Sequence, residues 1–452
     1  KICGNIGNLV NGEKIHHQIV SKGLVEKDVV LGTALVDMYA KYGLLEKAQE
    51  VLQGLPVRDT VSWNAMITGY SQHGRFHEAL DCFDQMKMKG FSPDHITYLS
   101  ALKACGVARA IGMGKKIHNE IIRQHILPES IELNSALVDM YSKCGMVAKA
   151  HEVLDELPVR NIVSWNALIT GYVQGGHGCE ALDCFPRMQR EGLHPNEVTF
   201  TCILKACASI GALDMGEQIH REIVNRGFLK NSIVLGCGLV DMYAKCGMLV
   251  KAQKVLEDLS IRDTISWSAL IAGYSQKGKF DEAINCFEQM QREGLSPNEV
   301  TFLCVLNACS QTGKLVEAQV YYEKMSQKYG FTPQVEHHSC MVVMFGHAGC
   351  FDKAMSIIKT IPSSEKPSVW LTLLCACKKW GNMKLGRLAF EEVIQLDNNL
   401  APAYTIMANI YAAAGMLEDA EKVDAMRLKY SPWKKGEKSL QGEDASCYSM
   451  KI

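Results

Sequence analysis

A ten-residue phrase recurs three times along the chain at a constant interval. It reads VSWNAMITGY from Val61, VSWNALITGY from Val163 and ISWSALIAGY from Ile265, so successive copies start 102 residues apart. Such self-similarity indicates an array of small structural units, and 452 residues is longer than a single hydrophobic core usually grows. Cysteines and prolines keep the same step, as at Cys105, Cys207 and Cys309 and at Pro93, Pro195 and Pro297.

Each copy contains three segments, which in the first complete copy are residues 60–94, 95–130 and 131–161. In the first segment, Trp63, Ile67 and Tyr70 follow the i, i+4, i+7 spacing of one helix face. A glycine then breaks the pattern, and a second amphipathic helix pattern follows. Because a hairpin of this size cannot bury its apolar face alone, neighbouring hairpins must stack. The predicted fold is all-α, a superhelical solenoid of helix-turn-helix repeats.

The charge and hydropathy of the chain argue against some classes of protein. Lys and Arg total 48 against 49 Asp and Glu, which gives a formal net charge of −1. The chain therefore lacks the overall basic charge of many nucleic-acid binders, and any such binding must come from a local surface. No apolar run reaches the roughly 18 to 20 residues that span a bilayer, and the N-terminal residues match neither a signal peptide nor a transit peptide.

The three segments read VSWNAMITGYSQHGRFHEALDCFDQMKMKGFSPD at 61–94, HITYLSALKACGVARAIGMGKKIHNEII at 95–122 and ALVDMYSKCGMVAKAHEVLDELPVRN at 136–161. They resemble the pentatricopeptide repeat family of plant organellar RNA-binding proteins, in the subclass that alternates 35-residue, longer and shorter motifs. The resemblance covers about residues 1 to 430 and implies that the superhelix is right-handed. In its register Cys3 is the eleventh residue of a long motif, so we expect about eight residues of that motif to precede Lys1, and the lack of a transit-peptide pattern is then no argument against an organellar protein.

The resemblance also divides the chain into motifs. Residues 367–400 and 401–430 look like the two E motifs that follow such arrays, and residues 431–452 are expected to form a divergent tail. Long motifs are expected at 1–28 (partial), 95–130, 197–232 and 299–334; short motifs at 29–59, 131–161, 233–263 and, in variant form, 335–366; and 35-residue motifs at 60–94, 162–196 and 264–298.

A helical solenoid can read single-stranded RNA one base per repeat when each repeat aims a polar side chain at its concave face. The fifth residue of a motif, such as Asn64, fits this role because it is a hydrogen-bonding residue near the start of the first helix. Helix capping is the alternative explanation of Asn and Ser at this place. The resemblance implies that the fifth and last residues of a motif act together. The predicted base-binding pairs are Thr33 and Asp59, Asn64 and Asp94, Ser135 and Asn161, Asn166 and Asn196, and Ser268 and Asn298.

The resemblance implies a base for each pair, because an ionised Asp only accepts hydrogen bonds whereas Asn both donates and accepts. In chain order the predicted bases are G, U, A, a pyrimidine with C preferred, and A. Cys237 with Asp263 departs from the pattern and is expected to read no base. The long motifs have Leu99, Thr201 and Leu303 at the fifth position, and the two leucines cannot hydrogen-bond a base. Read toward the RNA 3′ side, the expected sequence is 5′-G-U-N-A-Y-N-N-A-3′.

Two further sets of residues are candidates for RNA contact. The second residues of the 35-residue motifs resemble those on which bases stack in the family, with ordinary packing at the helix start as the alternative. Lysines that recur near the ends of the first helices are candidates for phosphate binding, with a solvated lysine near a helix C-terminus as the alternative. The stacking candidates are Val61, Val163 and Ile265, and the phosphate candidates are Lys41, Lys143 and Lys245.

An enzymatic function has little support in the sequence. Zinc deaminases, which end some members of the subclass, need a His-x-Glu and a Cys-x-x-Cys. His118 with Glu120, and His220 with Glu222, have the first spacing, but no Cys-x-x-Cys occurs. The 18 cysteines recur at equivalent positions too far apart in a solenoid to form one site, so we expect core packing in a reducing compartment rather than disulfides or metal binding. The chain is expected to be no enzyme and to need no cofactor.

The leading hypothesis is a sequence-specific single-stranded RNA-binding factor of a mitochondrion or chloroplast. The E-like motifs imply that it recruits a deaminase-domain partner for cytidine-to-uridine editing, with no role for DNA or a membrane. Transcript processing or stabilisation without editing is one alternative. A protein-binding helical scaffold is another, because AYTIMANIYAAAG at 403–415 resembles a tetratricopeptide pattern.

Overall fold

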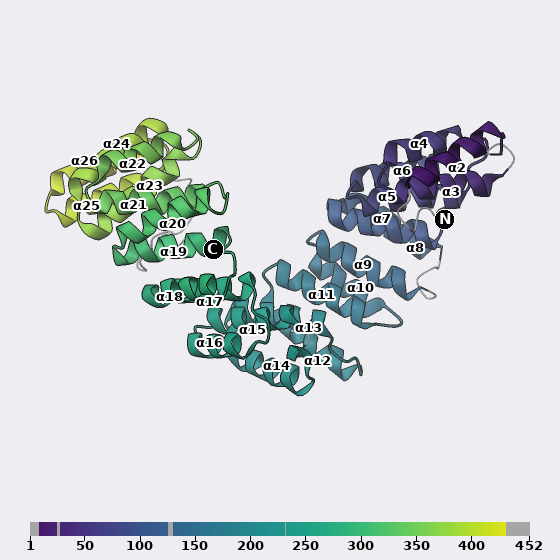
Figure 1. The fold of residues 1–452 in the computed structure, drawn as a ribbon, viewed down its shortest axis with the longest axis horizontal. Coiled ribbons are helices and arrows are strands. Elements are labelled where there is room, and N and C mark those ends of the chain that lie inside the picture. The colour runs from purple at the N-terminus through teal and green to yellow at the C-terminus, as the bar shows by residue number, and fades with distance from the viewer. Residues whose placement is uncertain (1–8, 25–27, 125–129, 231, 431–452) are drawn as a thin grey trace. The chain divides into compact units, whose positions relative to one another are not determined.

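The computed structural model describes residues 9–24, 28–124, 130–230 and 232–430 (Figure 1). The predicted tail 431–452 and parts of the partial motif 1–28 lie outside the described residues. The chain forms two compact units, residues 1–228 and 229–452. Every regular element in the described ranges is a helix, so the predicted all-α repeat fold is confirmed.

The first unit is a series of helical hairpins. After α2 (Leu9–Ser21) come the hairpins α3 (Val29–Lys41) and α4 (Leu45–Gly54), α5 (Thr60–Gln72) and α6 (Phe76–Met88), α7 (His95–Ala108) and α8 (Ile111–Arg123), α9 (Ile131–Lys143) and α10 (Val147–Glu156), α11 (Ile162–Gln174) and α12 (Gly178–Arg190), and α13 (Glu197–Ile210) and α14 (Leu213–Asn225). The short 3-10 helix η2 (Phe228–Lys230) follows α14.

The second unit continues the same pattern. Its hairpins are α15 (Ile233–Lys245) and α16 (Leu249–Asp258), α17 (Thr264–Gln276) and α18 (Phe280–Arg292), α19 (Glu299–Thr312) and α20 (Leu315–Gln327), α21 (Val335–His347) and α22 (Phe351–Thr360), α23 (Lys366–Trp380) and α24 (Met383–Leu396), and α25 (Ala401–Ala413) and α26 (Leu417–Tyr430). The last two hairpins occupy the residues that resemble E motifs.

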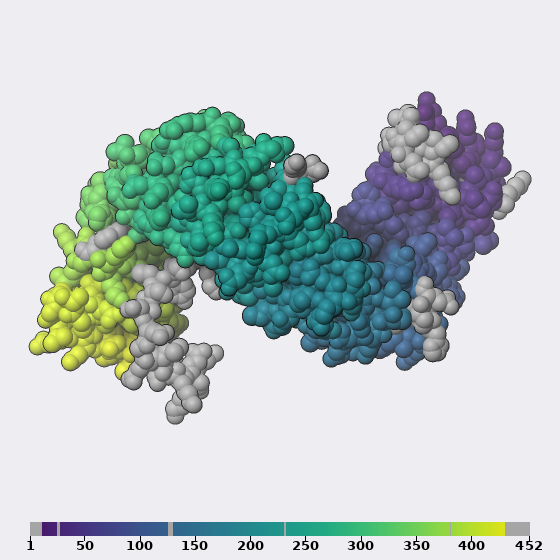
Figure 2. All heavy atoms as spheres, turned by 90° about the horizontal axis from the view of Figure 1, so that it is seen from below, coloured from purple at the N-terminus to yellow at the C-terminus, as the bar shows by residue number. Residues whose placement is uncertain are grey.

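Within each unit the first helix of a hairpin packs against its own second helix and against the first helix of the next hairpin, as α5 does with α6 and α7. Contacts therefore join segments that are near in sequence, and the colour in Figure 2 changes gradually within each unit. Trp63, Ile67 and Tyr70 of α5 are buried in these contacts, as the spacing of the first motif predicts. No helix of the described ranges is both long enough and apolar enough to span a bilayer.

The turn inside a hairpin depends on glycine. Gly74 follows α5 with a φ of 77°, a backbone conformation that residues with a Cβ rarely adopt. Its backbone N–H donates to the carbonyl of Ser71, and the next N–H, that of Arg75, donates to the carbonyl of Tyr70. These bonds satisfy carbonyls at the end of the helix and reverse the chain into α6.

Candidate nucleic-acid interface

In most motifs the last residue is the N-cap of the next motif's first helix. The carboxylate of Asp94 accepts a hydrogen bond of 2.9 Å from the backbone N–H of Thr97, whose hydroxyl in turn accepts one from the Asp94 N–H. The alternative explanation of Asn64 as a cap is wrong, because Asn64 is the fifth residue of α5 and the cap of that helix is Asp59. Equivalent capping boxes with Asp59, Asn161, Asn196, Asp263 and Asn298 begin α5, α11, α13, α17 and α19.

The fifth and last residues of a motif lie in contact between two neighbouring first helices. The amide of Asn64 donates to both carboxylate oxygens of Asp94, at 2.9 Å each. A base that approached one of these side chains would therefore meet both. The other predicted pairs in contact are Asn166 Nδ2 with Asn196 Oδ1 at 3.1 Å, Ser135 Oγ with Asn161 Oδ1 at 3.2 Å, and Thr33 Oγ1 with Asp59 Oδ1 at 3.4 Å.

One further motif keeps this contact with a thiol as the fifth side chain, and another lacks the contact. The Cys237 thiol lies 3.2 Å from Asp263 Oδ1, so the motif predicted to read no base keeps the same neighbour. The Ser268 hydroxyl instead donates to the backbone carbonyl of Thr264, one turn back in α17. Among the described residues it makes no hydrogen bond to Asn298.

The polar pair in the first 35-residue motif is held in a fixed network. Asn64 is only 6% exposed, and its side-chain oxygen accepts a hydrogen bond from the Thr97 hydroxyl. Partial burial raises the pKa of Asp94, but hydrogen bonds from Thr97 and Asn64 outweigh that effect and leave the pKa below its ordinary value. Asp94 is therefore an acceptor at neutral pH, as the predicted base assignment requires.

An exposed aliphatic residue occupies the second position of most first helices. In α5, Val61 is 59% exposed, whereas Trp63 is 2% exposed. Residues 61, 64 and 68 have i, i+3, i+7 spacing and so share one side of the helix, which we call the front face; residues 63, 66 and 70 share the opposite side, the rear face. Val163 and Ile265, the other stacking candidates, are likewise exposed, and so are Val30, Ile96, Val198, Val234 and Val300, which sequence reasoning missed although they have the same motif position.

The three predicted phosphate-binding lysines are engaged in ion pairs on their own helices. Lys41, Lys143 and Lys245 lie 2.8, 2.7 and 2.9 Å from the aspartates Asp37, Asp139 and Asp241, each four residues earlier. An RNA phosphate would have to compete with that carboxylate. Their role in phosphate binding stays a prediction.

Two lysines that sequence reasoning missed are better placed. Lys103 in α7 and Lys205 in α13 are exposed, and neither forms an ion pair with a described residue. Each lies seven residues, or two turns, after an exposed second residue, Ile96 or Val198, and so on the same front face. The repeat spacing could have identified them, because both stand in the phrase LKAC, 102 residues apart.

The His-x-Glu sequences have structural partners. The His118 ring is buried with Nδ1 2.9 Å from the Tyr141 hydroxyl, and this burial lowers the pKa of His118. Glu120 forms an ion pair of 2.5 Å with Lys87. In the ranges that the structure describes, no group of three or more His, Cys, Asp or Glu side chains could hold a metal ion, and most of the described cysteines are buried thiols.

The fold and this interface define a class: helical-hairpin repeat proteins in which each repeat presents a short set of polar and aliphatic side chains on one face. Comparison with protein-family models places the chain within that class. The PPR repeat family model matches residues 58–106, 160–209 and 262–311, and the PPR repeat model matches 33–58, 135–162, 198–228, 237–262, 300–329 and 402–423.

Relatives agree with this assignment. A mitochondrial pentatricopeptide repeat-containing protein of Arabidopsis thaliana is 34% identical over 92% of the chain and 75% of its own length. The chloroplastic pentatricopeptide repeat-containing protein CRR2 of the same plant is 35% identical over 93% of the chain and 64% of its own length. The chain belongs to the pentatricopeptide repeat family, and these organellar names agree with the predicted location.

The fold also matches a solved structure. The maize pentatricopeptide repeat protein PPR10 superposes with a TM-score of 0.63 at 20% identity, over 95% of this chain and 68% of that one. PPR10 in complex with an 18-nucleotide psaJ RNA element gives a TM-score of 0.73 at 17% identity, over 91% of this chain and 62% of that one.

Proposed function

We propose that the chain binds single-stranded RNA in a sequence-specific manner and acts as a site-recognition factor in organellar RNA modification. The observation that carries the proposal is the contact between the fifth and last side chains of a motif, seen for Asn64 with Asp94 and for Asn166 with Asn196. Each such pair offers donors and acceptors next to exposed aliphatic residues on which a base can stack. The likeness of the fold to RNA-bound PPR10 supports this proposal.

The proposed target follows 5′-G-U-N-A-Y-N-N-A-3′. The first three pairs, from Thr33 to Asn161, supply G, U and A, and the pair of Asn166 and Asn196 supplies the pyrimidine. Ser268 with Asn298 supplies the last A. The Ser135 and Ser268 hydroxyls both donate to a backbone carbonyl one turn back in their own helix, so in these two motifs the base depends more on the last residue, Asn161 or Asn298.

The proposed modification is cytidine-to-uridine editing by a deaminase-domain partner, recruited through α23 to α26. The chain would then be an adaptor and not the catalyst. The alternatives are transcript processing or stabilisation and, in another class, a protein-binding scaffold.

Selection from a pool of randomised RNA tests the proposed binding. We expect recovery of sequences related to 5′-G-U-N-A-Y-N-N-A-3′ and affinity that falls as salt rises. A variant with Asn64, Ser135, Asn166 and Ser268 all replaced by Ala is the matched control, and it should lose the sequence preference. Failure to select any RNA would contradict the proposal and favour the scaffold.

Sequencing of organellar transcripts from a line that lacks the protein tests the proposed modification. Editing is supported if a cytidine that lies downstream of a matching site, and that is converted to uridine in the wild type, stays cytidine in this line. Changed transcript ends or abundance, with every edited position intact, would replace editing by processing or stabilisation.

A further inference from the structure

The rear faces of the 35-residue motifs differ in one position. In the second copy, Glu191 accepts a hydrogen bond from the indole of Trp165 at 2.8 Å, and its other oxygen lies 2.6 Å from Arg160 Nη1. In the third copy Glu293 makes the same two contacts, with the Trp267 indole at 3.1 Å and with Arg262 Nη1. One carboxylate thus joins a buried tryptophan to an arginine in both copies.

In the first copy the residue at this position is Lys89. The equivalent Trp63 is 2% exposed, and its indole nitrogen has no hydrogen-bond partner among the described residues. Arg58 donates from Nε to the carbonyl of Leu52 at 2.8 Å and from Nη2 to that of Gln53, the same two bonds that Arg160 makes in the second copy. The Nη1 of Arg58, the atom that binds glutamate in the other copies, has no such partner in the part of the chain that the structure describes. Two donors therefore lack the acceptor that Glu191 and Glu293 provide in the other two copies.

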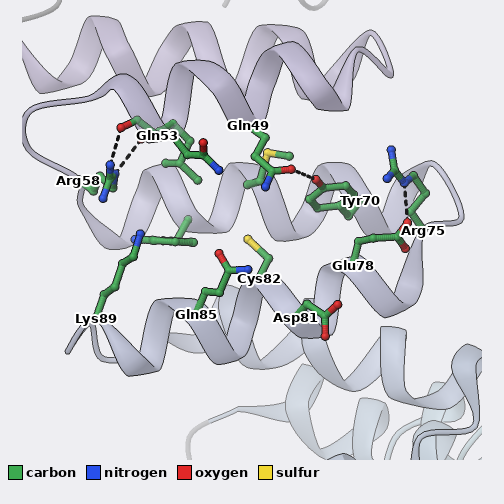
Figure 3. A pocket seen from close by; sticks show the side chains of 13 residues that line it. Gln49, Gln53, Arg58, Tyr70, Arg75, Glu78, Asp81, Cys82, Gln85 and Lys89 are labelled. Carbon is green, nitrogen blue, oxygen red and sulfur yellow. Dashed lines mark hydrogen bonds and ion pairs between the residues drawn. The ribbon is translucent and has the colours of Figure 1, made fainter.

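A cavity of about 160 Å³ lies at this place, between α4, α5 and α6 (Figure 3). The corresponding cavity in the third copy, next to Trp267 and Arg262, measures only about 10 Å³. Since a single water needs roughly 10 to 15 Å³ measured in this way, the first cavity has room for a larger guest.

The charges around the cavity are divided between its ends. Arg58 and Lys89 lie at one end and Arg75, Glu78 and Asp81 at the other (Figure 3). Arg75 is paired with Glu78 at 2.9 Å and with Glu46, so its charge is compensated. Lys89 is exposed and has its ammonium 5.1 Å from the centre of the Trp63 ring, with no carboxylate partner among the described residues. The end with the two unpaired donors is therefore cationic.

We propose that this cavity binds a small organic carboxylate. One oxygen accepts the Trp63 indole N–H and the other accepts Arg58 Nη1, as Glu191 and Glu293 do in the other copies, while the Lys89 ammonium moves from the ring to the anion. A carboxylate fits this site because Glu191 and Glu293 bind the equivalent tryptophan and arginine donors in the other two copies with the two oxygens of one planar carboxylate. Trp63 lies on the rear face of α5 and Val61 on its front face, so the site is separate from the candidate RNA interface.

Titration with sodium propionate, against sodium chloride at equal ionic strength, tests the site. In the full chain labelled with ¹⁵N-tryptophan, the indole resonance that disappears in Trp63→Phe should shift and saturate, whereas those of Trp165 and Trp267 should not. In Lys89→Glu the same resonance should be shifted before any addition and should show no further response. Propionate should also raise the Tm of the unsubstituted chain and leave that of Lys89→Glu unchanged.

No saturable shift of the Trp63 resonance, or an equal shift in Lys89→Glu, would overturn the proposal. Inorganic phosphate as a third titrant decides the ligand class: a shift as large as that with propionate, at the same concentration, would overturn the assignment to carboxylates. If Trp63→Phe does not fold, Lys89→Glu and the corresponding variants of Trp165 and Trp267 still identify the resonance. RNA affinity should be the same in Lys89→Glu, so this result is independent of the proposed RNA binding.

Discussion

Asp94 has two tasks, since it caps α7 and contacts Asn64. We predict that Asn64→Ser combined with Asp94→Asn changes the preferred base at this motif from U toward A. Ser and Asn at these positions form the combination predicted to read A elsewhere in the chain, and Asn can cap a helix as well as Asp. Fluorescence anisotropy with RNAs that differ in this one base measures the change. Unaltered selectivity would refute the base assignment.

The capping task can be separated from base contact by two substitutions of the same residue. Asp94→Ala should cost about 1 kcal/mol of stability because α7 loses its cap, whereas Asp94→Asn should change stability little. The lowered pKa of Asp94 means that its stabilising effect is present above the ordinary carboxyl pKa and is lost as pH falls through the lowered value. Urea denaturation at pH 7 and at acid pH measures both effects. Equal stability of the two variants at pH 7 would show that the cap is unimportant.

Packing between first helices depends on a glycine in the repeated phrase. A Cβ on Gly171 of α11 would lie 2.6 Å from Ser142 Cβ in α9, and in the other copies Gly69 and Gly273 approach Ala40 and Ala244 as closely. We predict that Gly171→Ala destabilises the chain by about 1 to 3 kcal/mol through overpacking. Gly112→Ala is the control, because a Cβ there meets nothing within 4 Å, and helix propensity favours Ala. Thermal unfolding followed by circular dichroism compares them, and equal Tm values would rule out the steric explanation.

The sequence predicted the helices well and their mutual contacts poorly. Helical spacing is a local property, so Trp63, Ile67 and Tyr70 sufficed to predict a buried face. The role of Asp94 as a cap depends on the exact start of α7, and the close approach of Gly171 depends on Ser142, about 30 residues earlier in the sequence. The pairing of Lys143 with Asp139 is a local i,i+4 contact that the helical spacing could have predicted. The fifth residues were candidates from their polar side chains near the helix start, but their pairing with the last residues, such as Asn64 with Asp94, was predicted only through the family resemblance. The repeat spacing alone would have added the exposed second residues.

At the scale of the whole molecule, a net charge of −1 leaves RNA binding to local cations. Most of the lysines and arginines in ion pairs have partners on the same or a neighbouring helix, as Lys41 has in Asp37 and Arg75 in Glu46. Such pairs contribute little positive potential. Two of the long motifs have leucine as their fifth residue. Lys103 and Lys205 lie in long motifs, and neither has an ion-pair partner among the described residues. We infer that Lys103 and Lys205 bind phosphates of the RNA proposed above, whereas the equivalent position of the third complete long motif, Asn307, has no charge to do so.

Phosphate binding by Lys103 and Lys205 predicts a specific salt dependence of RNA affinity. If Lys103 and Lys205 each contact one phosphate, the double variant Lys103→Gln, Lys205→Gln should make the slope of log affinity against log salt shallower by about 1.4, because each phosphate contact to a single strand contributes about 0.7. Base preference should stay the same, since phosphates carry no sequence information. The control Lys115→Gln, Lys116→Gln removes the same charge from exposed positions on the second helix α8. Anisotropy titrations over a range of salt concentrations measure both slopes, and equal slopes for the two variants would mean that only net charge matters and that the long motifs make no local phosphate contact.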